Sequence, residues 1–502
     1  MKTTFTVLLI TFFLAGYSQG IRYSDVIKED VRDINFEVIG KVSDRIHIYK
    51  NVRWKHMLAV YDANMNLVSN SRMQFMPDKT INVDFVVYPD HSVLVYQYLK
   101  KNVIYCMAAR VDAEGRKIGE PVLLDTARIG MLMDRKIHGT VYSEDRSHIL
   151  VYRMQKKNNS LLLKTLLFDK NLNLKETSLT SLPFDDYRDV YSEMSVDNNG
   201  NVVFIHERRR ANRDGVIGLN VYTKNVGVKE VIMHRIPLSD VAVDEVSLKI
   251  DNLNRKYLLY SLYYDQPGGS IYGLFTTRLE PNSTPATGAF IPFSDSLRET
   301  LSSRGISRNA FDNMFIREII VRRDGGFIIN MEDHYSYASN SPTSWNRFNY
   351  LTNSAYPGSH DYYMYNPSYR NYYRSYPFNQ LQAVRYYYND IAILSIDKDL
   401  QPEWSTIIHK KQVSDESDNF LSYTRMNQGS EILYLFVENE KKNEVVTNHS
   451  VLPDGTVKRN GTLRGNETGF EFMPRLAKQV SQRQVVIPAL YRGFITFALV
   501  EI

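Results

Sequence analysis

The sequence predicts an all-β protein built from a repeated unit of four antiparallel strands. Two observations support this prediction, the residue composition and a degenerate internal repeat. The 502 residues include 35 Tyr and 23 Phe but only 3 Trp, and Tyr and Phe, like Ile and Val, are favoured on pleated sheets. Hydrophobic residues make up 43% of the chain and charged residues 23%, which is an ordinary globular composition. The chain therefore has enough apolar material for a large core.

The repeat starts with a polar turn that leads directly into a β-branched or aromatic run, as a tight hairpin into a buried strand does. Its first five turns lie at Asp44, Asp90, Asp145, Asp197 and Asp251, which are 46, 55, 52 and 54 residues apart. Two later copies lie at residues 324–326 and 427–429. Each turn is followed by an apolar run that ends in Asp or another turn former. Each interval holds about four strand-length runs, which is typical of a β-propeller blade.

The apolar runs at residues 93–99 and 258–264 are nearly continuous, as expected for inner strands packed between neighbouring blades. Residues 465–502 offer roughly three more strands. With a strand from the N-terminus of the mature chain they complete an eighth blade and close the ring. Eight blades are favoured, and the alternative is seven, with the last strands added to the first blade. One helix is predicted, over residues 295–313, between blades five and six.

The first 20 residues are expected to be a secretory signal peptide. Lys2 gives a positive start, residues 5–15 are apolar, and residues 18–20 form a small-x-small cleavage site, so the mature chain begins at Ile21. The apolar run is too short to span a bilayer, and no later segment is long and apolar enough to do so. Cys106, the only cysteine, is expected to be a buried thiol. An exported protein without disulfides favours a bacterial envelope: periplasmic, outer-membrane-associated or extracellular.

Residues 333–385 interrupt the repeat of the sixth blade with a segment dense in Tyr, Asn, Ser and Pro. Exposed Tyr and Trp serve as rigid recognition surfaces, and interleaved Arg suits an anionic partner. The alternative is a long loop without a function of its own. The candidate binding residues are Tyr335, Tyr337, Trp345, Tyr350, Tyr362, Tyr363, Tyr365, Tyr369, Tyr372, Tyr373, Arg370 and Arg374.

Several functions lack support in the sequence. The chain has 61 basic and 56 acidic residues and a formal charge of +5, too balanced for a nucleic-acid-binding protein of this size. No His, Cys and carboxylate cluster has metal spacing, and no nucleophile elbow or phosphate loop occurs, so neither a metal nor a cofactor is expected. The basic run at residues 206–214 is expected to be a solvated hairpin loop.

A propeller glycosidase needs two carboxylates around a sugar. The candidates at strand ends are Glu193, Asp244, Glu318 and Glu332, and the sequence alone does not pair them. Glu332 is of particular interest because it opens the Tyr-rich insertion, where an acid could face a ligand. A turn or capping role is the alternative for this residue.

Residues 322–327, 386–391 and 404–412 together resemble a pattern in uncharacterised exported bacterial proteins of similar length. This resemblance covers the last 190 residues or so and implies no known reaction. The repeat itself resembles that of β-propeller proteins over nearly the whole mature chain, which implies a fold but no function.

These observations predict an exported, non-catalytic propeller that contacts an envelope protein or a glycan through its loops. The alternative is a carbohydrate-active enzyme with carboxylates from several blades at the mouth of the central channel. Convergence of buried carboxylates with shifted pKa values would favour the enzyme.

Overall fold

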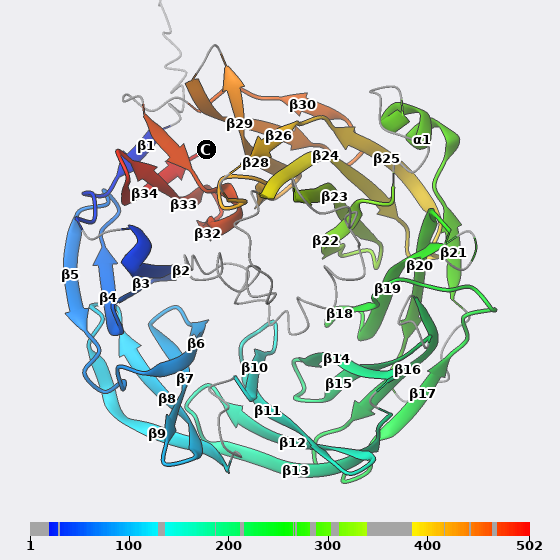
Figure 1. Ribbon diagram of the computed structural model, residues 1–502, viewed down its shortest axis with the longest axis horizontal. Helices are drawn as coiled ribbons and strands as arrows, with labels where there is room; N and C mark the ends of the chain where they lie inside the picture. Colours follow the sequence, from blue (N-terminus) through cyan, green and yellow to red (C-terminus); the bar gives the residue numbers. More distant parts are fainter. Residues whose placement is uncertain are drawn as a thin grey trace, which may run out of the picture.

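Eight antiparallel sheets are arranged in a ring around a central axis, in a computed structural model of the chain (Figure 1). The structure describes residues 20–28, 31–128, 136–185, 187–210, 215–264, 266, 269–281, 288–302, 311–338, 384–415, 417–440, 443–463 and 469–502. The prediction of an eight-bladed β-propeller is thereby confirmed. The turns at Asp44, Asp90, Asp145, Asp197 and Asp251 each join the innermost strand of a blade to its second strand, so the repeat was read in the correct register.

The first four blades follow one another along the chain. They are β2 (Ile34–Val42), β3 (Arg45–Val52), β4 (Lys55–Tyr61) and β5 (Leu67–Arg72); β6 (Thr80–Val87), β7 (His91–Lys100), β8 (Val103–Asp112) and β9 (Lys117–Arg128); β10 (His138–Tyr142), β11 (His148–Lys157), β12 (Ser160–Asp169) and β13 (Leu174–Pro183); and β14 (Asp189–Val196), β15 (Val202–Arg209), β16 (Val216–Lys224) and β17 (Ile232–Ile236).

Blades five to seven continue the same order. They are β18 (Ser247–Asp251), β19 (Lys256–Tyr264), β20 (Ile271–Leu279) and β21 (Ala289–Pro292); β22 (Met314–Val321), β23 (Phe327–Ala338), β24 (Val384–Ile396) and β25 (Pro402–Ile408), with β26 (Gln412–Ser414) also paired to β24; and β27 (Tyr423–Gln428), β28 (Glu431–Glu440), β29 (Asn443–Val451) and β30 (Val457–Arg459).

The eighth blade joins the two ends of the chain. It contains β31 (Phe470–Phe472), β32 (Lys478–Ser481), β33 (Gln484–Tyr491), β34 (Phe494–Glu501) and, as its outer strand, β1 (Gly20–Tyr23). Gly20 pairs with Glu501 and Tyr23 with Ala498, and the ring of Tyr23 stacks on Phe470 at 4.1 Å. The predicted closure of the ring by an N-terminal strand is therefore confirmed.

Aspartates shape the turns at one end of the blades. In the turns after β4, β8, β12, β14 and β24, one carboxylate oxygen accepts the backbone N–H groups two and four residues later. These bonds satisfy donors that leave the strand ladder, which is why Asp recurs there. We call this end the turn face. The opposite end, with the hairpins between second and third strands and the connections between blades, is the hairpin face.

Helices are few among the described residues. They are the short η1 (Val31–Asp33) and η2 (Pro474–Leu476) and the helix α1 (Asp295–Ser302). The helix covers the first part of the predicted span, and residues 303–310 lie outside the described residues. In the described part of the chain, no helix has the length and apolar character needed to cross a membrane.

Cys106 is fully buried in β8, as predicted. The basic run is not the expected solvated loop in its first part, because His206, Glu207 and Arg209 lie in β15 and are buried. Residues 211–214 of that run lie outside the described residues.

Candidate functional site

Four carboxylates meet near the central axis between blades four and five. They are Glu193 in β14, Glu207 in β15, and Asp244 and Glu245 in the connection that leads to β18. Glu193 lies at a bulge of the innermost strand, where its φ of +54° and the shifted register remove it from the strand ladder. Its Oε2 instead accepts the backbone N–H of Leu248 in the next blade at 3.1 Å. We call these four residues the acid group.

Glu207 has a structural role within the acid group. Its Oε1 accepts the backbone N–H of Val246 at 2.7 Å, and its Oε2 accepts Nη2 of Arg209 at 2.6 Å. Gln97 makes the equivalent contact between blades two and three, where it binds the backbone N–H and carbonyl of His138 at 2.9 Å and 2.8 Å. A buried polar side chain on the second strand thus fastens the entry of the next blade in both places.

Glu193 and Glu245 are half-buried residues, whereas Glu207 is fully buried, and the pKa values of Glu193 and Glu245 are raised. Burial raises the pKa of Glu193 to about 7, and the nearby charge of Glu207 adds to this effect. Burial, followed by the charges of Glu207, Glu193 and Asp244, raises the pKa of Glu245 to about 8. Asp244 accepts the hydroxyl of Tyr264 at 2.9 Å. A carboxyl group with a pKa raised to about 7 or 8 can donate a proton near neutral pH, which general acid–base chemistry requires.

The four acids predicted at strand ends, Glu193, Asp244, Glu318 and Glu332, lie at different places in the structure. Glu193 and Asp244 belong to the acid group. Glu318 lies on the innermost strand of blade six and forms a bidentate ion pair with Arg425 of blade seven. Glu245 and Glu207 were not among the predicted acids, although Glu245 adjoins Asp244 in the chain.

Glu332 belongs to a different, buried network between blades six and seven. Its Oε1 lies 2.7 Å from Nζ of Lys410, and its Oε2 accepts Nε of Arg317 at 3.0 Å and Oγ of Ser422 at 2.7 Å. The Glu332 and Lys410 side chains are fully buried. Glu332 is therefore neither the ligand-facing acid nor the turn residue that the sequence suggested, because the packed blades enclose it.

The Tyr-rich insertion begins on a hairpin that continues blade six on the hairpin face. There β23 and β24 pair from His334 and Tyr388 to Ala338 and Val384. The rings of Tyr335 and Tyr387 stack on this stem at 4.7 Å, and both side chains are partly exposed.

Of the other predicted binding residues, Tyr337 lies in β23, but the position of its side chain is not among those described. Trp345, Tyr350, Tyr362, Tyr363, Tyr365, Tyr369, Tyr372, Tyr373, Arg370 and Arg374 lie outside the described residues. No group of His, Cys, Asp and Glu among the described residues is arranged to hold a metal ion.

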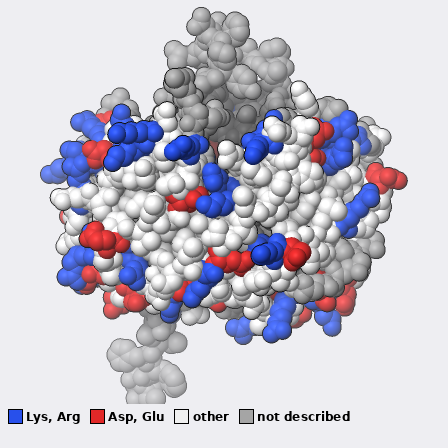
Figure 2. Space-filling model, turned by 90° about the horizontal axis from the view of Figure 1, so that it is seen from below, with Lys and Arg blue, Asp and Glu red and all other residues white. Residues whose placement is uncertain are grey.

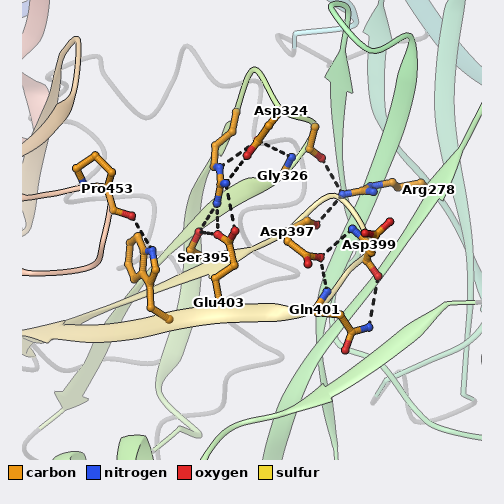
Figure 3. Close-up of polar contacts among 12 residues, drawn as sticks. Arg278, Asp324, Gly326, Ser395, Asp397, Asp399, Gln401, Glu403 and Pro453 are labelled. Atoms are coloured by element: carbon orange, nitrogen blue, oxygen red, sulfur yellow. Dashed lines mark hydrogen bonds and ion pairs between the residues drawn. The ribbon is translucent and has the colours of Figure 1, made fainter.

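Arg322 and Asp324, which belong to the segments that resemble exported bacterial proteins, take part in a polar network on the turn face (Figure 3). Arg322, in the turn between β22 and β23, donates from Nε to Asp324 at 3.1 Å and from Nη1 to Ser395 at 2.7 Å. It also pairs with Glu403, whose Oε2 accepts the Ser395 hydroxyl at 2.7 Å. This network ties both turns of blade six together.

Neighbouring blades also contact this part of blade six (Figure 3). Arg278 of blade five donates from Nη2 to the carbonyl oxygens of Gly325 at 2.8 Å and Asp397 at 3.1 Å. Trp404 of blade six donates to the carbonyl oxygen of Pro453 in blade seven at 2.9 Å. Gly325 and Trp404 of the resembling segments thus contact blades five and seven, which is a structural role.

Comparisons with known proteins do not identify a family. No protein-family profile and no curated protein matches the chain, so the resemblance to exported bacterial proteins stays a prediction. A prolyl oligopeptidase from Galerina marginata aligns with 84% of this chain at 9% identity and a TM-score of 0.36. The alignment covers 55% of that chain, so the present chain spans about half its length.

Two carbohydrate-active enzymes also align. A polysaccharide lyase, an ulvan lyase, covers 82% of this chain and 90% of its own at 9% identity and a TM-score of 0.35. A thermostable family-43 glycoside hydrolase covers 54% of this chain and 98% of its own at 9% identity and a TM-score of 0.26. At these identities and TM-scores, none of the likenesses carries an argument about function.

Proposed function

We propose that the chain is an exported, non-catalytic β-propeller of the bacterial envelope, which binds an envelope protein or a glycan through its hairpin face. The observation that carries the proposal is the stem of blade six. Its two strands have 12 and 13 residues and carry the partly exposed Tyr335 and Tyr387 to the start of the insertion. Stacked Tyr rings offer apolar faces and hydroxyl groups at low entropic cost, which suits sugar rings and protein surfaces alike.

The path of the chain is consistent with this orientation. Gly20 pairs with Glu501, at the end of β34 that lies on the turn face. The chain therefore enters the fold from the turn face, on the side opposite the stem. A leader cleaved after Gly20 leaves residues 21–23 for the closing strand, so export and ring closure are compatible.

The test replaces residues 339–383 with a short Gly-Ser linker and leaves β23 and β24 intact. A second variant, Tyr335→Ser with Tyr387→Ser, removes the stacked pair alone. Binding of the mature protein is measured on glycan arrays and by proximity labelling in envelopes, and thermal unfolding reports the fold. The proposal expects the linker variant to lose binding at an unchanged unfolding midpoint. Undiminished binding by the linker variant would refute it.

A second candidate function is a carbohydrate-active enzyme, favoured by the acid group. Glu193 and Glu245 carry raised pKa values beside the carboxylate of Asp244, an arrangement able to donate a proton to a glycosidic oxygen. Release of reducing ends from a panel of envelope and plant polysaccharides measures this activity. Glu193→Gln and Glu245→Gln should each abolish this activity without changing stability at acidic pH. Glu318→Gln, the control, should leave the activity intact. Wild-type protein without activity on the whole panel contradicts this candidate.

A further inference from the structure

Three consecutive blades combine cations and large apolar side chains at the tips of their hairpins. The tips join the second and third strands of blades eight, one and two, which are neighbours in the ring (Figure 1). We call them the docking tips. Their residues are Arg492 and Phe494 in blade eight, Arg53, Trp54 and Lys55 in blade one, and Leu99, Lys100 and Lys101 in blade two.

The side chains at the docking tips are exposed. The exposed fraction is 60% for Trp54, 40% for Phe494 and 36% for Leu99. The cations of all three tips are exposed as well. Each docking tip therefore presents an apolar side chain beside one or more positive charges, all from the same face of the propeller.

Turn geometry does not explain these residue types. Arg53 and Trp54 have φ values of +50° and +69°, and Lys101 has +47°. A two-residue hairpin with positive φ favours Asn and Gly, and a bulky side chain there costs energy. Trp54 is thus an exposed indole in a left-handed conformation. The turn itself does not favour an indole at this position.

The positive charges at the docking tips are largely unneutralised. Within the described residues, Lys55, Lys100 and Lys101 form no ion pair, whereas Arg53 pairs with Asp33 at 2.6 Å.

The next two blades extend the basic edge. The corresponding hairpins carry the exposed Lys156 and Lys157 in blade three and Arg208 in blade four. Figure 2 shows Lys and Arg side chains along the upper edge of the molecule, with a few Asp and Glu side chains among them.

We propose that the docking tips bind peripherally to an anionic lipid surface. Lys and Arg would lie at the level of the phosphate groups, and Trp54, Phe494 and Leu99 would enter the interfacial region of the bilayer. Cations attract anionic lipid head groups, and Trp is favoured at membrane interfaces. A soluble polyanion is the less fitting partner, because it gains little from Leu99 and Phe494. The inference goes beyond the proposed function, since it needs neither the insertion nor the acid group.

The test measures co-sedimentation of the mature protein with phosphatidylcholine vesicles, with and without phosphatidylglycerol. The first variant is Lys55→Gln, Lys100→Gln and Lys101→Gln together. Its matched control is Lys170→Gln, Lys398→Gln and Lys458→Gln, which removes the same charge from exposed residues of the turn face. A second pair compares Trp54→Ser with Leu253→Ser, because Leu253 is exposed by 69% in a turn of the turn face.

Wild-type protein should bind vesicles that contain phosphatidylglycerol, and salt should weaken the binding. The triple docking-tip variant should partition about 100-fold less, at roughly fivefold for each lysine near the surface. Trp54→Ser should lower partitioning about tenfold, and both controls should match wild type.

Three results would overturn the inference. The first is equal binding to vesicles with and without the anionic lipid. The second is an equal loss of vesicle binding in the docking-tip variants and their controls. The third is lysine-dependent binding to dextran sulfate without binding to vesicles. The variant that lacks residues 339–383 should still bind vesicles. Its result separates failure of the lipid proposal from failure of the proposed function.

Discussion

Replacement of Glu332 by Gln should destabilise the propeller strongly. The substitution keeps the shape of the side chain but removes the negative charge that faces Lys410 and Arg317. The ammonium group of Lys410 is fully buried, and Gln412 is its other acceptor, with Oε1 at 3.0 Å. A buried cation that loses its counter-charge costs about 3–5 kcal/mol. The free energy of unfolding should fall by that amount.

A double substitution tests whether the loss comes from the stranded charge. In Glu332→Leu with Lys410→Met, both charges are replaced by apolar groups of similar volume, which is often nearly neutral. Arg317 still loses an acceptor, although its guanidinium group also lies 5.6 Å from the centre of the Tyr388 ring. The double variant should therefore be at least about 2 kcal/mol more stable than the sum of the two single changes predicts.

The assay is equilibrium unfolding in urea at neutral pH, followed by far-ultraviolet circular dichroism. Arg72→Ala is the control, because its ion pair with Asp78 at 2.7 Å is exposed and worth less than about 1 kcal/mol. Burial alone would raise the pKa of Glu332, but Lys410 and Arg317 hold it below its usual value. Stability from this carboxylate is present above the ordinary Glu pKa and is lost as the pH falls through the lowered one. A loss below 1 kcal/mol for Glu332→Gln, or strict additivity in the double variant, would refute the reasoning.

Three further predictions concern other parts of the ring. Gly455→Ala should lower the free energy of unfolding by about 2–4 kcal/mol, because a Cβ at Gly455 would lie 2.7 Å from Trp404. Gly493→Ala should lower it by only about 1 kcal/mol, because Gly493 has a similar φ but open space around it. Equal urea midpoints for the two variants would contradict this prediction. Raised pKa values at Glu193 and Glu245 contribute stability at low pH that is lost as the pH rises through them, so the melting temperature should fall between about pH 5 and pH 8. The double Gln variant should flatten that profile, and parallel curves would count against it. Deletion of β1 should lower the melting temperature. It should also expose the edge of β34 and so promote self-association, which light scattering measures. An unchanged melting temperature would show that closure of the ring needs no N-terminal strand.

Much of the fold was predictable because blade geometry repeats locally. Asp197 and its counterparts mark turns by hydrogen bonds to backbone groups two and four residues away, so the signal lies within a few residues of sequence. The continuous apolar runs mark strands buried on both faces, and their spacing marks the blades. The helix prediction is confirmed over Asp295–Ser302, whereas residues 311–313, at the end of the predicted span, form a turn.

The candidate site was only partly predictable. Glu193 and Asp244 were selected as acids at strand ends, but the sequence did not show that they meet, or that Glu332 pairs with Lys410 instead. The basic run at residues 206–209 was read as solvated, although packing between blades buries Arg209 against Glu207. The hairpins of blades eight, one and two carry ordinary surface residues when read one at a time.

The sequence by itself determined the all-β class, the repeat and the turn positions, and it left seven and eight blades open. These features depend on local hydrogen bonding and on the periodicity of apolar residues, which neighbouring residues encode. Only the tertiary structure decided which charges are buried together and which face each hairpin occupies. Those properties arise when the ring closes and brings residues from different blades into contact, so the electrostatics of the acid group and of the docking tips exist only in the assembled propeller.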